Sequence, residues 1–202
     1  MHTNTKALVL AGGGAKGSYQ VGVFRGLREV GWRPGIVTGT SVGSLNGALL
    51  VMDRLEEAER LWLTLDIHGV LETPKSSKPE ELRAFLLKVL RSGGLNIDPL
   101  GGTIDEYLDE ERMRAAPTRY GLVMTEMNTL KSHQYTLEEI PRGRLKEYMM
   151  ASSACFPALR PQEIDGVKYI DGGWSDNIPL AVAARMGASR RLAEDIVGGG
   201  VD

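Results

Sequence analysis

The chain opens with short apolar runs, glycine-rich turns and segments of helical spacing that follow one another twice. Residues 6–11 form an apolar run that ends in three glycines, which is typical of a fully buried parallel strand. Over residues 18–30 apolar positions recur every three to four residues, as on one face of a helix. The same order returns with a strand at 36–38 and a long helix over 44–65. Two such units predict an α/β fold with a parallel, helix-covered sheet.

The rest of the chain predicts shorter elements. Helices are expected at residues 79–90, 103–113, 144–154 and 180–186, and strands at 120–127, 132–137 and 167–170. The first two of these strands are near enough in sequence to form a hairpin. Residues 68–78 have the composition of a loop, and the mixed, irregular stretch 66–118 is interpreted as a lid or pocket cap. We expect one domain over residues 1–202.

Composition narrows the functional classes. Apolar residues make up 42% of the chain and charged residues 25%, as in ordinary soluble domains. The net charge of −2 gives no basic field that would attract nucleic acid. The single cysteine, Cys155, excludes an internal disulfide and a cysteine-rich zinc site, and it is interpreted as a small buried residue. The apolar run near the start is too short for a signal peptide, so we expect a cytoplasmic protein.

The segment Gly39-Thr40-Ser41-Val42-Gly43 lies between a predicted strand and a predicted helix. A G-x-S-x-G sequence at such a junction exposes a serine nucleophile on a tight, strained turn, and the small flanking residues permit the turn. The following helix directs its amides and positive dipole end toward developing negative charge. Ser41 is therefore the predicted nucleophile. The alternative is an ordinary turn in which Ser41 caps the helix.

The segment Gly12-Gly13-Gly14-Ala15-Lys16-Gly17 matches the dinucleotide-binding pattern G-x-G-x-x-G. That pattern requires an acidic residue at the end of the second strand, where this chain has Gly39-Thr40-Ser41. A phosphate loop is also disfavoured, because Lys16 precedes the last glycine. The preferred interpretation is an oxyanion hole made by the backbone amides of Gly12, Gly13 and Gly14. The alternative is a glycine turn that allows close helix–strand packing.

Asp171-Gly172-Gly173 ends another predicted strand, and Asp171 is the candidate base. A serine nucleophile needs a base, yet none of the three histidines follows Asp171, so the Ser-Asp-His order of the α/β-hydrolases is absent. An aspartate near its ordinary pKa of about 3.9 is a weak base. It would need alignment with Ser41 and strong oxyanion stabilisation. The alternative is an ordinary turn residue.

Together the three motifs resemble the patatin-like phospholipase family. Two further blocks agree in order, Ala151–Ala154 with Phe156-Pro157 and Asn177-Ile178-Pro179. The resemblance spans about residues 6–187 and implies a three-layer α/β/α fold with a mostly parallel sheet. It implies a serine hydrolase of lipid esters (phospholipid, lysophospholipid or acylglycerol) with a Ser41–Asp171 dyad, no cofactor or metal, and transient contact with a membrane surface. Met149 and Met150 are interpreted as core residues, with a pocket wall as the alternative, and for Trp62 and Trp174 the sequence leaves both interpretations open.

One stretch departs from the family pattern. After Gly187-Ala188 the family usually continues into an apolar strand, whereas residues 189–195 are mostly charged. We therefore expect the last strand to be truncated or diverged, which would leave the lipid-binding wall incomplete. This departure motivates a second hypothesis, a non-catalytic lipid- or acyl-binding module on the same scaffold.

Overall fold

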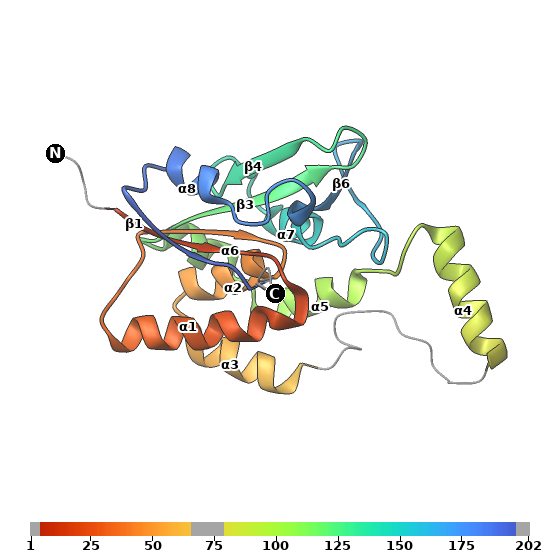
Figure 1. The fold of residues 1–202 in the computed structure, drawn as a ribbon, viewed down its shortest axis with the longest axis horizontal. Coiled ribbons are helices and arrows are strands. Elements are labelled where there is room, and N and C mark those ends of the chain that lie inside the picture. The colour runs from red at the N-terminus through yellow and green to blue at the C-terminus, as the bar shows by residue number, and fades with distance from the viewer. Residues whose placement is uncertain (1–4, 66–78, 197–202) are drawn as a thin grey trace, which may run out of the picture.

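A seven-stranded sheet forms the centre of the computed structural model, which describes residues 5–65 and 79–196 (Figure 1). The strand order is β5-β6-β3-β2-β1-β7, and β4 pairs with β3. Strands β7, β1, β2 and β3 are parallel, while β4 and β6 run antiparallel to β3. The bounds are β1 Lys6–Leu10, β2 Ile36–Thr40, β3 Arg119–Glu126, β4 Ser132–Thr136, β5 Gln162–Ile164, β6 Val167–Asp171 and β7 Arg190–Glu194. The expected mostly parallel sheet and the β3–β4 hairpin are confirmed.

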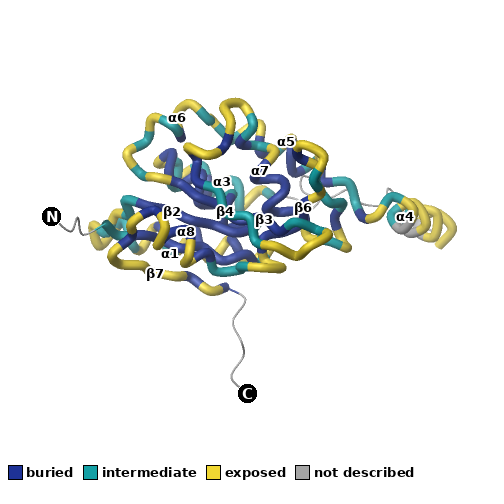
Figure 2. Tube along the Cα trace, turned by 90° about the horizontal axis from the view of Figure 1, so that it is seen from above, coloured by how far each residue is buried: buried dark blue, intermediate teal, exposed yellow. Residues whose placement is uncertain are grey.

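Helices cover both faces of the sheet, which confirms the three-layer architecture. Strand β1 shows the alternation: Leu8 and Leu10 pack in the core on the side of α1, α2 and α7, whereas Ala7 and Val9 pack with residues of α8. Figure 2 shows the buried strands between these exposed outer layers. The helices are α1 Gly17–Glu29, α2 Val42–Val51, α3 Leu55–Thr64, α4 Pro79–Ser92, α5 Asp98–Tyr107, α6 Glu110–Ala115, α7 Leu145–Ser152 and α8 Leu180–Arg185.

Two expected helices are each divided in two. The helix predicted over 44–65 forms α2 and α3, because Asp53 adopts a left-handed conformation with φ 55° between them. The helix predicted over 103–113 forms α5 and α6, because the Asp109 carboxylate accepts a hydrogen bond from the Arg112 amide at 2.9 Å and begins a new helix. Side-chain capping of this kind favours a helix start.

The charged stretch near the C-terminal end of the described chain forms a complete strand. β7 pairs in parallel with β1 from Arg190 to Glu194, so of the two expectations, a truncated or a diverged last strand, the structure shows a strand whose sequence has diverged. Arg190 and Arg191 are exposed, and charged residues are common on edge strands, where they disfavour pairing with other chains. Strand β5 was not predicted at all.

The expected cap region is only partly described. Residues 66–78, which include the predicted loop 68–78, lie outside the described residues. The helix predicted at 79–90 is confirmed as α4, which stands away from the body of the molecule (Figures 1 and 2). No helix within residues 5–65 and 79–196 is long and apolar enough to cross a membrane.

Candidate active site

Ser41 occupies a strained backbone position between β2 and α2. Its φ of 54° and ψ of −129° lie in a region that non-glycine residues rarely adopt, and such strain persists only where the surroundings enforce it. The flanking glycines explain how the turn fits. A Cβ on Gly39 would lie 2.2 Å from the Gly43 carbonyl oxygen, and one on Gly43 would lie 2.4 Å from the Leu10 carbonyl oxygen. Three backbone segments therefore meet here at distances that only glycine allows.

The sheet brings Asp171 to Ser41 by joining two strand ends. Strand β4 pairs with Gly121–Thr125 along one side of β3, so both β2 and β6 lie along the other side. The last residue of β2, Thr40, pairs with Val123, and the last residue of β6, Asp171, pairs with the adjacent Met124. β2 and β6 therefore run in opposite directions along the same side of β3, and their carboxyl ends face each other. Residues far apart in the sequence meet at the carboxyl end of β2.

Gly172 fits this junction without room for a side chain. A Cβ on Gly172 would lie 2.4 Å from the Val123 carbonyl oxygen and 2.9 Å from Thr40 Cγ2. Two hydrogen bonds hold the following segment against β2, because Thr40 Oγ1 donates to the Asp176 carbonyl at 2.9 Å and Thr38 Oγ1 donates to the Pro179 carbonyl at 3.1 Å. The segment after Asp171 is therefore fixed against β2.

The Asp171 carboxyl is 7% exposed, and its surroundings change its basicity. Burial raises the pKa of Asp171, because a buried carboxylate loses hydration. The side-chain hydrogen bond with Ser41 and the bond that the Gly173 amide donates to Asp171 Oδ1 at 2.7 Å act in the opposite direction and lower this pKa. The net shift is upward. Asp171 is thus a stronger base than an exposed aspartate, and the Ser41 side chain lies near enough to influence its pKa.

The glycine loop after β1 lies against Ser41. A Cβ on Gly12 would lie 3.0 Å from Ser41 Cβ. The Gly12 amide donates to the Asn177 carbonyl at 3.3 Å, so this amide is engaged in holding the loop. In the described part of the chain no acceptor is hydrogen-bonded to the amides of Gly13 or Gly14. Gly14 has φ 56°, which glycine adopts without strain.

A buried polar network that sequence reasoning missed supports this loop. Asn46 Nδ2 donates to the Gly17 carbonyl at 2.8 Å and to Gln20 Oε1 at 2.9 Å. Gln20 Nε2 donates to the Ala11 carbonyl at 2.9 Å, and Trp62 Nε1 donates to Asn46 Oδ1 at 2.9 Å. The network therefore fixes both ends of the glycine loop. Its only signal in the sequence is that Gln20 and Asn46 fall within helices rich in apolar residues.

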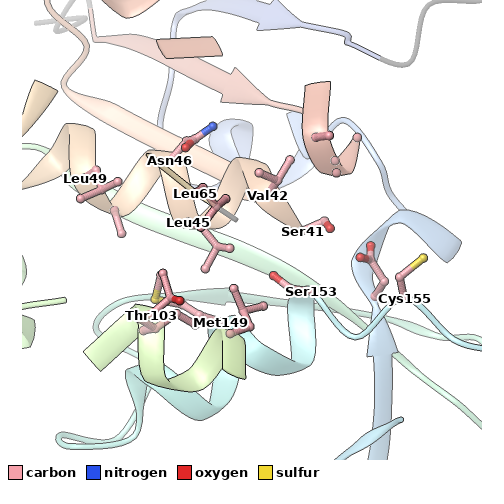
Figure 3. A pocket seen from close by; sticks show the side chains of 18 of the residues that line it. Ser41, Val42, Leu45, Asn46, Leu49, Leu65, Thr103, Met149, Ser153 and Cys155 are labelled. Carbon is pink, nitrogen blue, oxygen red and sulfur yellow. The ribbon is translucent and has the colours of Figure 1, made fainter. Parts of the chain in front are cut away.

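A cavity of about 1170 Å³ begins at Ser41 and extends between α2 on one side and α5 and α7 on the other (Figure 3). The glycine loop, Ser41, Asp171 and Asn177 line one end. The rest of the wall is mostly apolar, as is typical of small-molecule sites. Met149, Trp62 and Trp174 line it, and Met149 also packs in the core. The part of the expected cap that lines the cavity is α5, through Leu100, Thr103, Ile104 and Tyr107.

Cys155 and His133 are placed differently from Ser41 and Asp171. Cys155 is exposed and lines the cavity, so the expectation that it is buried is wrong; it lies in the loop beyond α7, past the last turn that packs in the core. Partial loss of hydration at the sulfur and the nearby Asp171 charge raise the pKa of its thiol, which disfavours the thiolate. His133 lies on β4 and pairs with Glu126 at 3.1 Å, and it does not line the cavity.

No cluster of three or more His, Cys, Asp or Glu residues that could hold a metal ion occurs among residues 5–65 and 79–196. The site instead presents a serine hydroxyl, that of Ser41, whose backbone is strained. A hydrogen-bonded buried carboxylate and two unengaged amides adjoin it, and an apolar cavity opens beside them. This set can attack a carbonyl carbon and stabilise the oxyanion that results.

Comparisons with known proteins agree with the motifs. A family model described as patatin-like phospholipase matches residues 8–184. Patatin-like phospholipase domain-containing protein 7 of Mus musculus is 29% identical over 195 residues, which cover 96% of this chain and 14% of that protein. An uncharacterised NTE family protein of Mycobacterium bovis is 27% identical over 95% of this chain and 49% of its own length. The chain thus spans half or less of these relatives.

A solved structure shares the fold. The crystal structure of VipD from Legionella pneumophila superposes with a TM-score of 0.59 and 18% sequence identity, covering 88% of this chain and 47% of that one. At this identity the likeness concerns the architecture alone.

Proposed function

Since the chain belongs to the patatin-like phospholipase family, we propose that it hydrolyses carboxylic ester bonds of lipids, with Ser41 as nucleophile and Asp171 as general base. The observation that carries this proposal is the end-to-end meeting of β2 and β6, which brings the buried Asp171 carboxyl near enough to the Ser41 side chain for the two to interact. A dyad of this kind needs no histidine, and His133, the one histidine within residues 5–65 and 79–196, is paired with Glu126.

The reaction has two halves. Asp171 takes the proton of the Ser41 hydroxyl while Ser41 Oγ bonds to the ester carbonyl carbon, and the carbonyl oxygen becomes an oxyanion. The Gly13 and Gly14 amides donate to that oxyanion, and Gly12 keeps the loop in place through Asn177. The C–O bond to the alcohol then breaks, and the alcohol leaves with the proton from Asp171. In the second half Asp171 takes a proton from a water molecule as the water oxygen bonds to the acyl carbon. The bond between that carbon and Ser41 Oγ then breaks, Asp171 returns the proton to Ser41 Oγ, and the fatty acid is released.

The oxyanion hole and the helix that follows Ser41 supply much of the rate enhancement. Removing one amide donor from an oxyanion hole typically costs about 10²–10³ in rate, and the first amides of α2 add positive potential beside the reacting serine. The Gly12 loop lies so close to Ser41 that a Cβ on Gly12 would come 3.0 Å from Ser41 Cβ, so little rearrangement is needed when the oxyanion forms. A weak carboxylate base suffices in such a site.

The substrate is proposed to be a phospholipid, lysophospholipid or acylglycerol that the protein reaches by transient contact with a membrane surface. The largely apolar cavity wall supports a fatty acyl group as ligand. Trp174 supports the surface contact, because it lines the cavity next to Asp171 and is 56% exposed. Tryptophan is favoured at the boundary between water and lipid.

Labelling with a fluorophosphonate, followed by mass mapping of the modified serine, tests the proposal directly. We expect Ser41 to be modified. Ser41→Ala and Asp171→Asn should each lower turnover of p-nitrophenyl butyrate by at least about 10³-fold, while circular dichroism stays unchanged. Ser189→Ala, an exposed serine outside the cavity, serves as the matched control and should keep full activity. Turnover retained by Ser41→Ala would refute the assignment.

The same labelling distinguishes a hydrolase from the alternative, a non-catalytic lipid- or acyl-binding module. A folded protein whose Ser41 does not react, but which still binds lipid, would be a binding module on this scaffold. The sequence argument for that alternative was an incomplete last strand, and β7 is complete along its pairing with β1. The strain at Ser41 also favours catalysis, since strained positions cluster at reactive sites.

A further inference from the structure

The cavity follows one face of α2 from its first turn to its end. Ser41, Leu45, Ala48, Leu49 and Met52 all line the cavity, and their spacing is that of a single helix face. An α-helix rises about 1.5 Å per residue, so the distance from Ser41 to Met52 along the helix axis is about 16 Å. Figure 3 shows Leu45 and Leu49 directed from α2 toward Thr103 and Met149 on the opposite wall. We call this face of α2, from Ser41 to Met52, the ruler, because its length can be compared with that of a chain bound beside it.

Away from Ser41, two hydrogen bonds join the segment after α2 to the end of α5 and the turn that follows it. Arg54 Nη1 donates to the Tyr107 carbonyl at 3.1 Å, and the Asp109 amide donates to Met52 Sδ at 3.4 Å. Both hydrogen bonds tie the turn after α2 to the turn after α5. Met52, Tyr107 and Leu108 line the cavity at this end. These residues thus stand where a chain that enters at Ser41 and follows α2 would arrive.

Polar groups are concentrated at the Ser41 end. The glycine loop, Asp171, Ser153 and Asn177 line that part, whereas farther along α5 contributes Leu100, Ile104, Tyr107 and Thr103, whose hydroxyl is hydrogen-bonded to the Pro99 carbonyl, and Leu108 follows them. The Asn46 side chain also lines the cavity, but it is hydrogen-bonded to Gly17, Gln20 and Trp62. The polarity of the cavity therefore matches a molecule with one polar end and one long apolar chain.

We propose that this cavity selects the acyl chain of the substrate by length. The ester carbonyl lies at Ser41, the chain runs beside α2, and its methyl end reaches Met52, Tyr107 and Leu108. An extended alkyl chain advances about 1.25 Å per carbon, because bonds of about 1.5 Å zigzag, so about 12–14 carbons fill the distance. The inference rests on the proposed function for the position of the ester, while the length limit comes from the cavity alone.

A series of p-nitrophenyl esters from butyrate to stearate, in one fixed detergent, measures the limit. For the wild-type protein we expect kcat/KM to rise with chain length up to about 12–14 carbons and to fall by about tenfold at 18 carbons, because each methylene that fits or clashes in an apolar pocket changes the rate severalfold. A profile with no optimum, or one that still rises at 18 carbons, would overturn the inference.

Two variants move the limit in opposite directions. Ala48→Met places a long side chain about 10 Å from Ser41 along α2, so laurate turnover should fall about tenfold while butyrate turnover stays within about twofold. Met52→Ala opens the closed end and should shift the optimum upward by about two carbons. Leu50→Met, on the same helix but outside the cavity lining, should leave the profile unchanged. If Ala48→Met lowered turnover equally for esters of every chain length, the proposed length limit would be contradicted. Butyrate turnover reports whether the fold is intact.

Binding of free fatty acids to Ser41→Ala protein separates this inference from the proposed function. Thermal stabilisation by acids of 8–18 carbons should be largest at about 12–14 carbons, the length that spans Ser41 to Met52. If no ester is hydrolysed but this optimum is found, the hydrolase assignment fails and the ruler stands. If short esters are hydrolysed but neither hydrolysis nor binding depends on chain length, the ruler fails and the hydrolase assignment stands.

Discussion

The two ends of the cavity are specified in different ways. At the Ser41 end the backbone decides the geometry, since Gly12, Gly39, Gly43 and Gly172 all lie where a Cβ would come within 3.0 Å of another atom. At the Met52 end side chains decide it, through dispersed leucines, isoleucine and methionine on α2, α5 and α7. The first end consists of three short sequence motifs, whereas the second is assembled from single positions on several helices.

This difference has energetic consequences. A backbone contact at 2.2–2.4 Å from a would-be Cβ cannot relax without moving a strand or a helix start. An apolar wall with a cavity beside it can adjust its side chains, and hydrophobic exchanges of similar volume usually cost less than about 1.5 kcal/mol. The chemistry should therefore be sensitive to small changes at one end, while the substrate range should be adjustable at the other.

The strongest expected effect comes from one methyl group at the Ser41 end. In Gly39→Ala the new Cβ would lie 2.2 Å from the Gly43 carbonyl oxygen and 2.5 Å from the Ser44 amide nitrogen, which forces α2 away from β2. We expect butyrate ester turnover to fall by at least about 10²-fold, because displacements of about 1 Å at a reacting group have effects of that size. The free energy of unfolding, measured in urea, should drop by about 3 kcal/mol.

The matched control is another glycine on a helix. Gly22→Ala in α1 adds a Cβ that meets nothing within 4 Å, and alanine stabilises a helix relative to glycine by about 0.5–1 kcal/mol. This variant should keep full activity and become slightly more stable. Unchanged activity in Gly39→Ala would show that the close approach at Ser41 is not needed for catalysis.

The pH dependence of turnover should follow Asp171. Burial raises the pKa of Asp171 above the ordinary aspartate value, and only the ionised carboxylate can accept the Ser41 proton. As the pH falls below this pKa, kcat/KM should fall about tenfold per pH unit, with a midpoint above about 3.9. The profile is measured with butyrate ester from pH 4 upward; a midpoint at or below that of an exposed aspartate would contradict the burial argument.

The same shift predicts the sign of a stability effect. Because the folded-state pKa of Asp171 is raised, its protonated form favours the folded state, and this stability is lost as the pH rises through the unfolded and then the folded pKa. Asp171→Asn, which stays neutral, should therefore raise the free energy of unfolding at pH 7 relative to wild type, and the gain should shrink toward pH 4. Chemical denaturation at both pH values measures the difference. An active site that lowers stability in this way is a familiar trade-off.

The sequence predicts the Ser41 end of the molecule better than the Met52 end, for a physical reason. Backbone-determined sites need particular residue types at fixed spacing, so β1, β2, the turn at Ser41 and the strand before Asp171 are visible in one sequence. The α2–α3 and α5–α6 breaks depend on single residues, Asp53 in a left-handed conformation and Asp109 as a cap. Those residues are common in helices, and hydrophobic periodicity continues through the breaks.

Contacts across the fold are the other part that one sequence does not reveal. The pairing of β7 with β1 is not visible in the sequence, because residues Arg190 to Ala193 are exposed and carry no apolar alternation. The network of Asn46, Gln20 and Trp62 joins three helices, and pairing between them depends on the packed structure. Cys155 was placed in the core on the statistics of its residue type, whereas the loop beyond α7 leaves it at the cavity.

The smallest expected effects are those of replacing two adjacent serines at the end of α7, Ser152 and Ser153. Ser152 Oγ accepts a hydrogen bond from the Ser41 amide at 3.0 Å, so Ser152→Ala leaves a buried amide without an acceptor at the strained nucleophile. A buried unsatisfied donor costs about 1–3 kcal/mol, and we expect a loss of stability in that range with about tenfold lower turnover. Ser153 Oγ is buried and has no hydrogen-bond partner among the described residues. Ser153→Ala should therefore change stability by less than about 0.5 kcal/mol, and equal effects of the two variants would mean that the Ser152 bond does not hold Ser41 in place.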